Sequence, residues 1–101
     1  MIQIKKERFE DLTKLDFIDY YEEDYGYVET KELNGCYWGS YETLKIYSDG
    51  TIEYLIYDGG YLEETRDLNE DLLNYEPVKK IIDYLIKEDI AEKVSDEWWK
   101  D

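Results

Sequence analysis

The segment Leu44–Tyr54, LKIYSDGTIEY, decides the fold because its turn fixes which residues face each other across a β-hairpin. We expect a three-residue loop at 48–50 with Gly50 in the left-handed region. A two-residue loop would place Glu53 opposite Ile46 and so pair a charge with the apolar face. The pairs predicted by the three-residue loop are Ile46 with Ile52 and Leu44 with Tyr54 on one face, and Lys45 with Glu53 and Tyr41 with Tyr57 on the other.

Two further turns extend this hairpin in both directions along the chain. Asn34-Gly35 is a hairpin signal that joins residues 27–33 to a strand beginning near Cys36. The segment 58–60, Asp-Gly-Gly, leads into a strand at 61–66. The sequence therefore predicts an antiparallel meander of about four strands over residues 27–66.

Apolar side chains before the meander recur every three or four residues, which is helical spacing. They predict an N-terminal helix that Gly26 ends, and residues 2–9 precede it as a short strand or an extended lead-in. The residues that carry this spacing are Leu12, Leu15, Ile18, Tyr21 and Tyr25.

A second helix is predicted after the meander, because Pro77 suits the first position of a helix. The apolar stripe that follows Pro77 continues toward Trp98, with a break near residues 87–89. We therefore expect a helix or a helix pair over 77–99, and a single α+β domain over residues 1–101. The stripe consists of Val78, Ile81, Ile82, Leu85, Ile86, Ile90, Val94 and Trp98.

Residue composition disfavours catalysis. The chain has no histidine among its 101 residues and a single cysteine, Cys36, so His-dependent triads and most zinc sites are excluded. Residues 67–71 match the start of a calcium loop, but Leu72 stands where its glycine belongs and Val78 where its bidentate glutamate belongs. We therefore expect a non-enzymatic protein without metal or cofactor. We also expect it to be cytoplasmic, because neither a signal peptide nor an apolar run long enough to span a bilayer is present.

The net charge of −15 indicates the class of partner. Residues 1–76 contain 20 acidic and 7 basic side chains, so the acidic excess lies mainly before Pro77. Like charge disfavours direct binding to nucleic acid or to anionic membranes. The expected partner is a basic protein.

The predicted binding surface combines carboxylates with tyrosines. Asp16, Asp19 and Glu23 fall at i, i+3 and i+7 of the predicted first helix, as a ladder with one step per turn. Tyrosine is enriched at interfaces and, with carboxylates, suits a groove rich in arginine and lysine. The candidate residues are Asp16, Asp19, Tyr20, Glu22, Glu23, Asp24, Glu29, Glu32, Glu53, Glu63 and Glu64, with Trp98 and Trp99 as a candidate oligomer contact.

In size, charge, its lone cysteine and the Tyr/Asp/Glu-rich composition from Asp16 to Tyr61, the chain resembles small acidic inhibitors of phages and mobile elements. These include anti-CRISPR and anti-restriction proteins that act as DNA mimics. The resemblance implies an inhibitor that occupies the basic, nucleic-acid-binding surface of a nuclease or CRISPR-type effector in the host cytoplasm.

Two other binding roles fit the same features. One is an immunity protein that neutralises a basic nuclease toxin through complementary charge. The other is an assembly or accessory protein that forms a dimer through its C-terminal helix and Trp98-Trp99.

Overall fold

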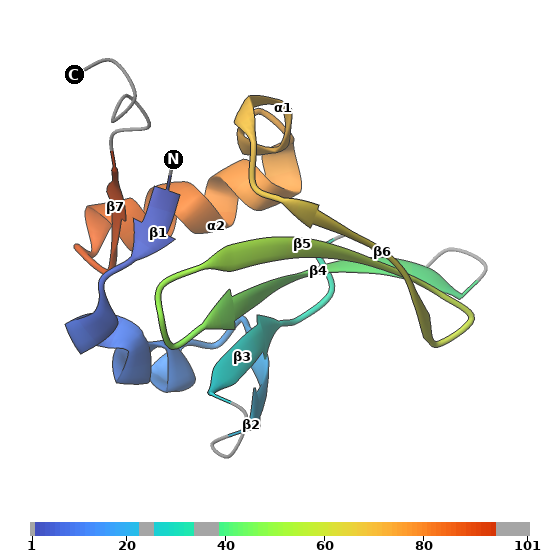
Figure 1. Ribbon diagram of the computed structural model, residues 1–101, viewed down its shortest axis with the longest axis horizontal. Helices are drawn as coiled ribbons and strands as arrows, with labels where there is room; N and C mark the ends of the chain where they lie inside the picture. Colours follow the sequence, from blue (N-terminus) through green and yellow to red (C-terminus); the bar gives the residue numbers. More distant parts are fainter. Residues whose placement is uncertain (1, 23–25, 34–38, 95–101) are drawn as a thin grey trace.

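The computed structural model describes residues 2–22, 26–33 and 39–94, with the backbone alone for 19–22. It confirms the α+β class (Figure 1). A five-stranded antiparallel sheet has the order β2-β3-β4-β5-β6, and a separate two-stranded sheet pairs β1 with β7. The five strands are β2 Ile18–Glu22, β3 Tyr27–Thr30, β4 Ser40–Tyr47, β5 Ile52–Asp58 and β6 Tyr61–Asp67.

The predicted register of the β4–β5 hairpin is confirmed pair by pair. Gly50 has φ +99°, and a Cβ at this position would lie 2.6 Å from the carbonyl oxygen of Ile4. The N–H of Ile4 donates to the Gly50 carbonyl oxygen at 2.9 Å. The turn therefore requires glycine both for its backbone conformation and for its contact with β1, Ile2–Ile4.

The next hairpin also has the predicted turn. Asp58 pairs with Tyr61 across Gly59 and Gly60, both of which have positive φ, as a two-residue type I′ loop requires. A register shift near Ile56 then inserts one extra residue into β6. The predicted meander is thus observed as β3–β6, although the Asn34-Gly35 turn and Cys36 lie outside the described residues.

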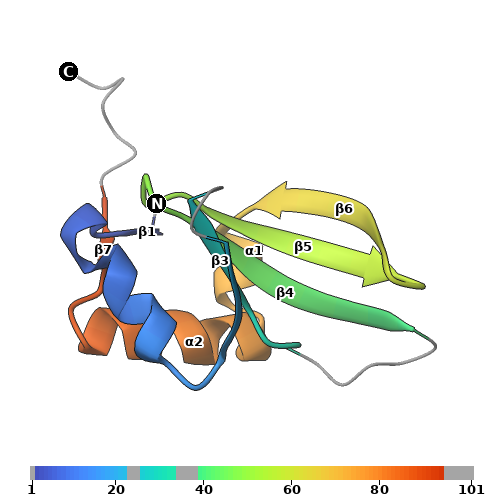
Figure 2. The same cartoon turned by 90° about the horizontal axis from the view of Figure 1, so that it is seen from below.

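The core lies between one face of the sheet and α2, Glu76–Lys87. Its buried residues from β3, β4 and β5 share one face because side chains alternate along a strand; they are Val28, Leu44, Ile46, Ile52 and Tyr54. Strands β4, β5 and β6 continue beyond α2 toward the β5–β6 turn (Figure 2). The fully buried side chains are Ile4, Leu12, Val28, Leu44, Ile46, Val78 and Leu85.

The N-terminal helix is shorter than predicted and begins earlier. It is the 3-10 helix η1, Lys6–Lys14, which buries Phe9 and Leu12. A 3-10 helix has three residues per turn, so a spacing of three suits it as well as it suits an α-helix. The predicted helical continuation is wrong over Ile18–Glu22, which form β2, because β-branched and aromatic residues favour a strand that can pair with β3; Tyr25 lies outside the described residues.

The C-terminal helix begins as predicted, with Pro77 in its first turn, and it ends at Lys87. Asp89 adopts φ +62°, while the N–H of Ile90 donates to Leu85 O at 2.8 Å and that of Asp89 to Ile86 O at 3.0 Å. These bonds form a Schellman motif, which ends the helix.

The second half of the predicted helix pair is wrong within the described residues. After the Schellman motif the chain forms β7, Ala91–Lys93, which pairs with β1. Residues 2–4 are therefore a strand, but of the small sheet. Residues 95–99, with Trp98 and Trp99, lie outside the described part of the chain.

The region between β6 and α2 contains one helical turn, α1, Glu70–Leu73. The Asn69 side chain caps it by accepting from the Leu72 N–H at 2.9 Å. The segment 67–71, which partly matches a calcium loop, therefore contains the cap residue of α1 and the first two residues of this helix. Within the described residues, no helix is long and apolar enough to cross a membrane.

Candidate partner-binding surface

The β5–β6 turn and β6 form the most exposed described element, which we call the acidic hairpin, residues 58–67. Every residue of β6 is exposed, so both faces of this strand are open to solvent. Tyr61 and Leu62, next to the turn, are 81% and 53% exposed and are the most exposed large apolar side chains described. The hairpin offers carboxylates and two apolar side chains in one place. Its charged residues are Asp58, Glu63, Glu64 and Asp67 against Arg66.

Arg66 offsets one of these four carboxylates. Its Nε donates to Glu64 Oε1 at 2.7 Å and its second amino group to Glu64 Oε2 at 3.0 Å. This exposed pair holds the pKa of the Glu64 carboxyl below its ordinary value. With Glu64 occupied, Asp58, Glu63 and Asp67 are the carboxylates of the hairpin that keep a net charge to offer.

The sheet face opposite α2 holds carboxylates of a different kind. Glu29 of β3 accepts from the Thr43 hydroxyl at 3.3 Å and from the Tyr57 hydroxyl at 3.2 Å. The Tyr57 ring stacks on Tyr41, with ring centroids 4.7 Å apart. Leu55, on the same face, is buried. Glu29 therefore fixes hydroxyl groups within a half-buried layer, which we call the tyrosine layer and which contains Tyr27, Tyr41, Tyr47 and Tyr57.

Lys45 and Tyr47 extend the same layer toward the covered end of the sheet. The Lys45 Nζ lies 4.0 Å from the centroid of the Tyr27 ring and 5.2 Å from that of Tyr47. The Tyr47 hydroxyl donates to Glu53. Burial, and then this bond to Glu53, raise the pKa of Tyr47 to about 12. The tyrosine and carboxylate side chains on this face of β3, β4 and β5 are therefore held by hydrogen bonds and ring contacts with one another.

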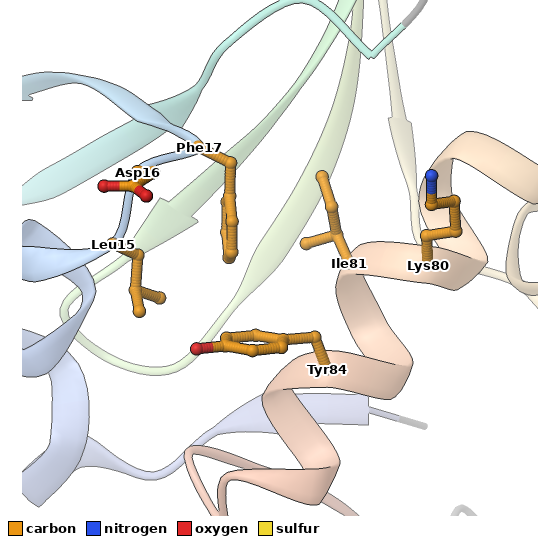
Figure 3. Close-up of a pocket in the computed structure, with 6 residues that line it drawn as sticks. All are labelled: Leu15, Asp16, Phe17, Lys80, Ile81 and Tyr84. Atoms are coloured by element: carbon orange, nitrogen blue, oxygen red, sulfur yellow. The ribbon is translucent and has the colours of Figure 1, made fainter.

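An apolar groove lies between α2 and the segment that follows η1 (Figure 3). It encloses about 340 Å³, and Phe17 faces Ile81 across it with the Tyr84 ring below them in this view. The Phe17 and Tyr84 rings meet edge to face at 5.8 Å. Asp16 and Lys80 stand at its border, so the groove has charge of both signs at its mouth.

The predicted binding residues do not form one surface. Asp16 precedes β2 and Asp19 lies within it, so the helical carboxylate ladder is wrong; its third member, Glu23, lies outside the described residues, as does Asp24. Glu29 and Glu53 face the tyrosine layer, whereas Glu63 and Glu64 lie in the acidic hairpin. Tyr20 and Glu22 belong to β2, where only the backbone is described, and Glu32 is exposed beside the groove.

Sequence reasoning missed the groove and the exposure of β6. Alternation of apolar and polar residues would have signalled a half-covered strand, and residues 61–67, YLEETRD, lack it after Leu62. That loss of alternation was the available signal that neither face of β6 is covered.

Acidic side chains do not gather into a cation site in the described residues, where no group of three or more is placed to hold a metal ion. No protein-family model, curated protein or solved structure matches the chain.

Proposed function

We propose that this protein is an acidic inhibitor that occupies the basic, nucleic-acid-binding surface of a nuclease or CRISPR-type effector. The observation that carries the proposal is the acidic hairpin, where three carboxylates and one arginine lie on β6, a strand exposed on both faces, and Asp58 adds a fourth carboxylate at the end of β5. A projecting, acidic strand fits a positively charged groove that normally holds a nucleic-acid strand.

The geometry favours contacts with individual basic side chains. Residues on one face of a strand repeat about every 6.6 Å, whereas each strand of a DNA duplex carries a phosphate about every 3.4 Å of helix axis. The hairpin therefore has a lower charge density than a DNA strand. Tyr61 and Leu62 add apolar area that a phosphate backbone lacks, and tyrosine is enriched at interface cores.

The test is a pull-down from host lysate at low and at high salt, with captured proteins identified by mass spectrometry. We expect a basic, nucleic-acid-binding protein that is retained at low salt, released at high salt and displaced by added DNA or RNA. Capture of a basic nuclease toxin would instead assign the immunity role.

A matched pair of variants localises the surface. Charge reversal of Glu63, Glu64 and Asp67 to lysine should abolish capture. The control reverses Glu10, Glu88 and Glu92, which are exposed at the other end of the molecule and give the same change in net charge. Equal capture by both variants would refute the assignment to the hairpin.

A further inference from the structure

The free edge of β6 offers backbone groups as well as charge. β6 is the last strand of the sheet order, so it has a hydrogen-bonded neighbour on one side, β5. An edge strand presents a row of N–H and C=O groups that an extended segment of another chain can pair with.

The register determines which residues of β6 present those groups. The N–H of Tyr47 donates to Thr51 O at 2.9 Å, which fixes the phase of the β4–β5 ladder. Successive residues of a strand direct their N–H and C=O groups to opposite sides, so the even-numbered residues of β5 direct these backbone groups toward β6. Tyr54 pairs with Arg66 and Ile56 pairs with Glu64, so Arg66 and Glu64 direct their backbone groups toward β5. The residues of β6 that alternate with these two direct their backbone groups outward, away from β5. These outward residues are Thr65 and Asp67.

We propose that an extended lysine- or arginine-rich segment of the partner adds to this edge as a further strand of the sheet. The inference rests on the function proposed above and specifies how the partner docks. Thr65 and Asp67 would supply main-chain hydrogen bonds, while the carboxylates of the acidic hairpin would pair with basic side chains that alternate along the added strand.

Charge selects this occupant over a second copy of the chain. Natural edge strands use charged side chains and bulges to prevent pairing with copies of themselves. Here the bulge lies between residues 62 and 64, next to the turn, and leaves 64–67 in regular register. Two such edges would bring like charges together, which disfavours self-pairing, whereas a basic strand gains attraction at the same positions.

The experiment measures binding of a fluorescein-labelled peptide of about eight residues in which lysine and valine alternate. A peptide of the same length and charge that alternates lysine and proline is the control, because proline cannot take part in a β-ladder. By fluorescence anisotropy at low ionic strength, we expect the lysine-valine peptide to bind about tenfold more tightly, the equivalent of one or two hydrogen bonds. Equal binding of the two peptides would overturn strand addition.

Two variants at one position separate the backbone from the side chain. Thr65→Pro removes an outward N–H, and proline is tolerated on edge strands; it should weaken lysine-valine peptide binding about tenfold. Thr65→Val keeps the N–H and the β-branched shape and should bind as the unchanged protein does. Unchanged binding by Thr65→Pro would overturn the docking mode.

Amide hydrogen exchange provides a measurement that needs no variant. Addition of the lysine-valine peptide should slow exchange at Thr65 and Asp67, and unaltered exchange at both would overturn the proposal. Protection that instead increases with the concentration of the protein alone, together with a dimer in light scattering, would identify a second copy as the occupant and overturn it too.

The two proposals fail in different ways. If Thr65→Pro binds normally while the triple lysine variant of the hairpin does not, strand addition is refuted and the acidic binding surface stands. If the triple variant binds both peptides as the unchanged protein does, the acidic hairpin is not the binding surface and both proposals fall.

Discussion

The same two strands, β4 and β5, are covered at one end and open at the other. Near the Ser48–Gly50 turn, Ile46 and Ile52 are buried among residues of α2, η1 and β1. At the other end, β5 continues into the acidic hairpin, and all of β6 is exposed as it returns along β5 to Glu53. Burial of apolar side chains at one end supplies the stability that lets the other end present like charges, which by themselves oppose compaction.

Core substitutions should show the difference between the ends most strongly. Leu85 of α2 is fully buried, and Leu85→Ala should lower the free energy of unfolding by roughly 2–5 kcal/mol, because it removes buried apolar contacts and leaves a cavity. Leu62→Ala in the acidic hairpin should change it by less than about 0.5 kcal/mol. Urea unfolding measures both, and similar losses would contradict the division.

The two glycine turns offer the next test, since both have positive φ and only one is packed. Gly50→Ala places a methyl group against the Ile4 carbonyl and should cost roughly 2–4 kcal/mol. At Gly60, whose Cβ position has no neighbour within 4 Å, alanine should cost about 1–2 kcal/mol for the backbone conformation alone. Thermal unfolding would contradict this account if Gly60→Ala were the more destabilising change.

A smaller effect should come from the tyrosine layer, and it should depend on pH. Because the pKa of Tyr47 is raised to about 12, the folded state keeps this proton while the unfolded chain loses it near pH 10. The stabilisation is therefore complete below pH 10 and is lost as pH rises toward 12. Tyr47→Phe should cost about 1 kcal/mol at pH 7, and this difference should shrink across pH 10–12. A difference that stays constant in urea unfolding over that range would contradict the assignment.

An effect of similar size should come from α1, the helical turn that joins β6 to α2. Asn69→Ala removes the cap of α1 and should cost about 1 kcal/mol. Asn69→Asp keeps an oxygen acceptor and should remain close to the unchanged protein in thermal unfolding. An equal loss in both variants would show that the cap is not what stabilises this turn.

Local turn chemistry made the meander predictable. Residues 48–50 and 58–60 admit few turn types, and each fixes the register of the strands beside it. The start of α2 was predictable for a similar reason, because Pro77 and the apolar spacing after it agree.

Long-range pairing explains what the sequence did not reveal. Ile18 fits both an apolar helical stripe and a strand, and pairing with Thr30 of β3 decides for the strand. Ile90 likewise fits a helical stripe until Asp89 adopts its left-handed conformation. Of the candidate surface, the net charge was predictable, but the separation of Glu29 and Glu53 from Glu63 and Glu64 depends on which strands have neighbours on both sides.

The pairing of β1 with β7 has a consequence for the order of folding. Ile4 pairs with Ala91, so this sheet closes a loop that contains nearly the whole chain, whereas each hairpin closes a loop of a few residues. The entropy of closure grows with loop length, and contacts between distant residues form slowly. The hairpins should therefore form first and the β1–β7 sheet last. Until β7 arrives, Ile2 and Ile4 lack a neighbouring strand, so the slowest step in folding is also the step that completes the core.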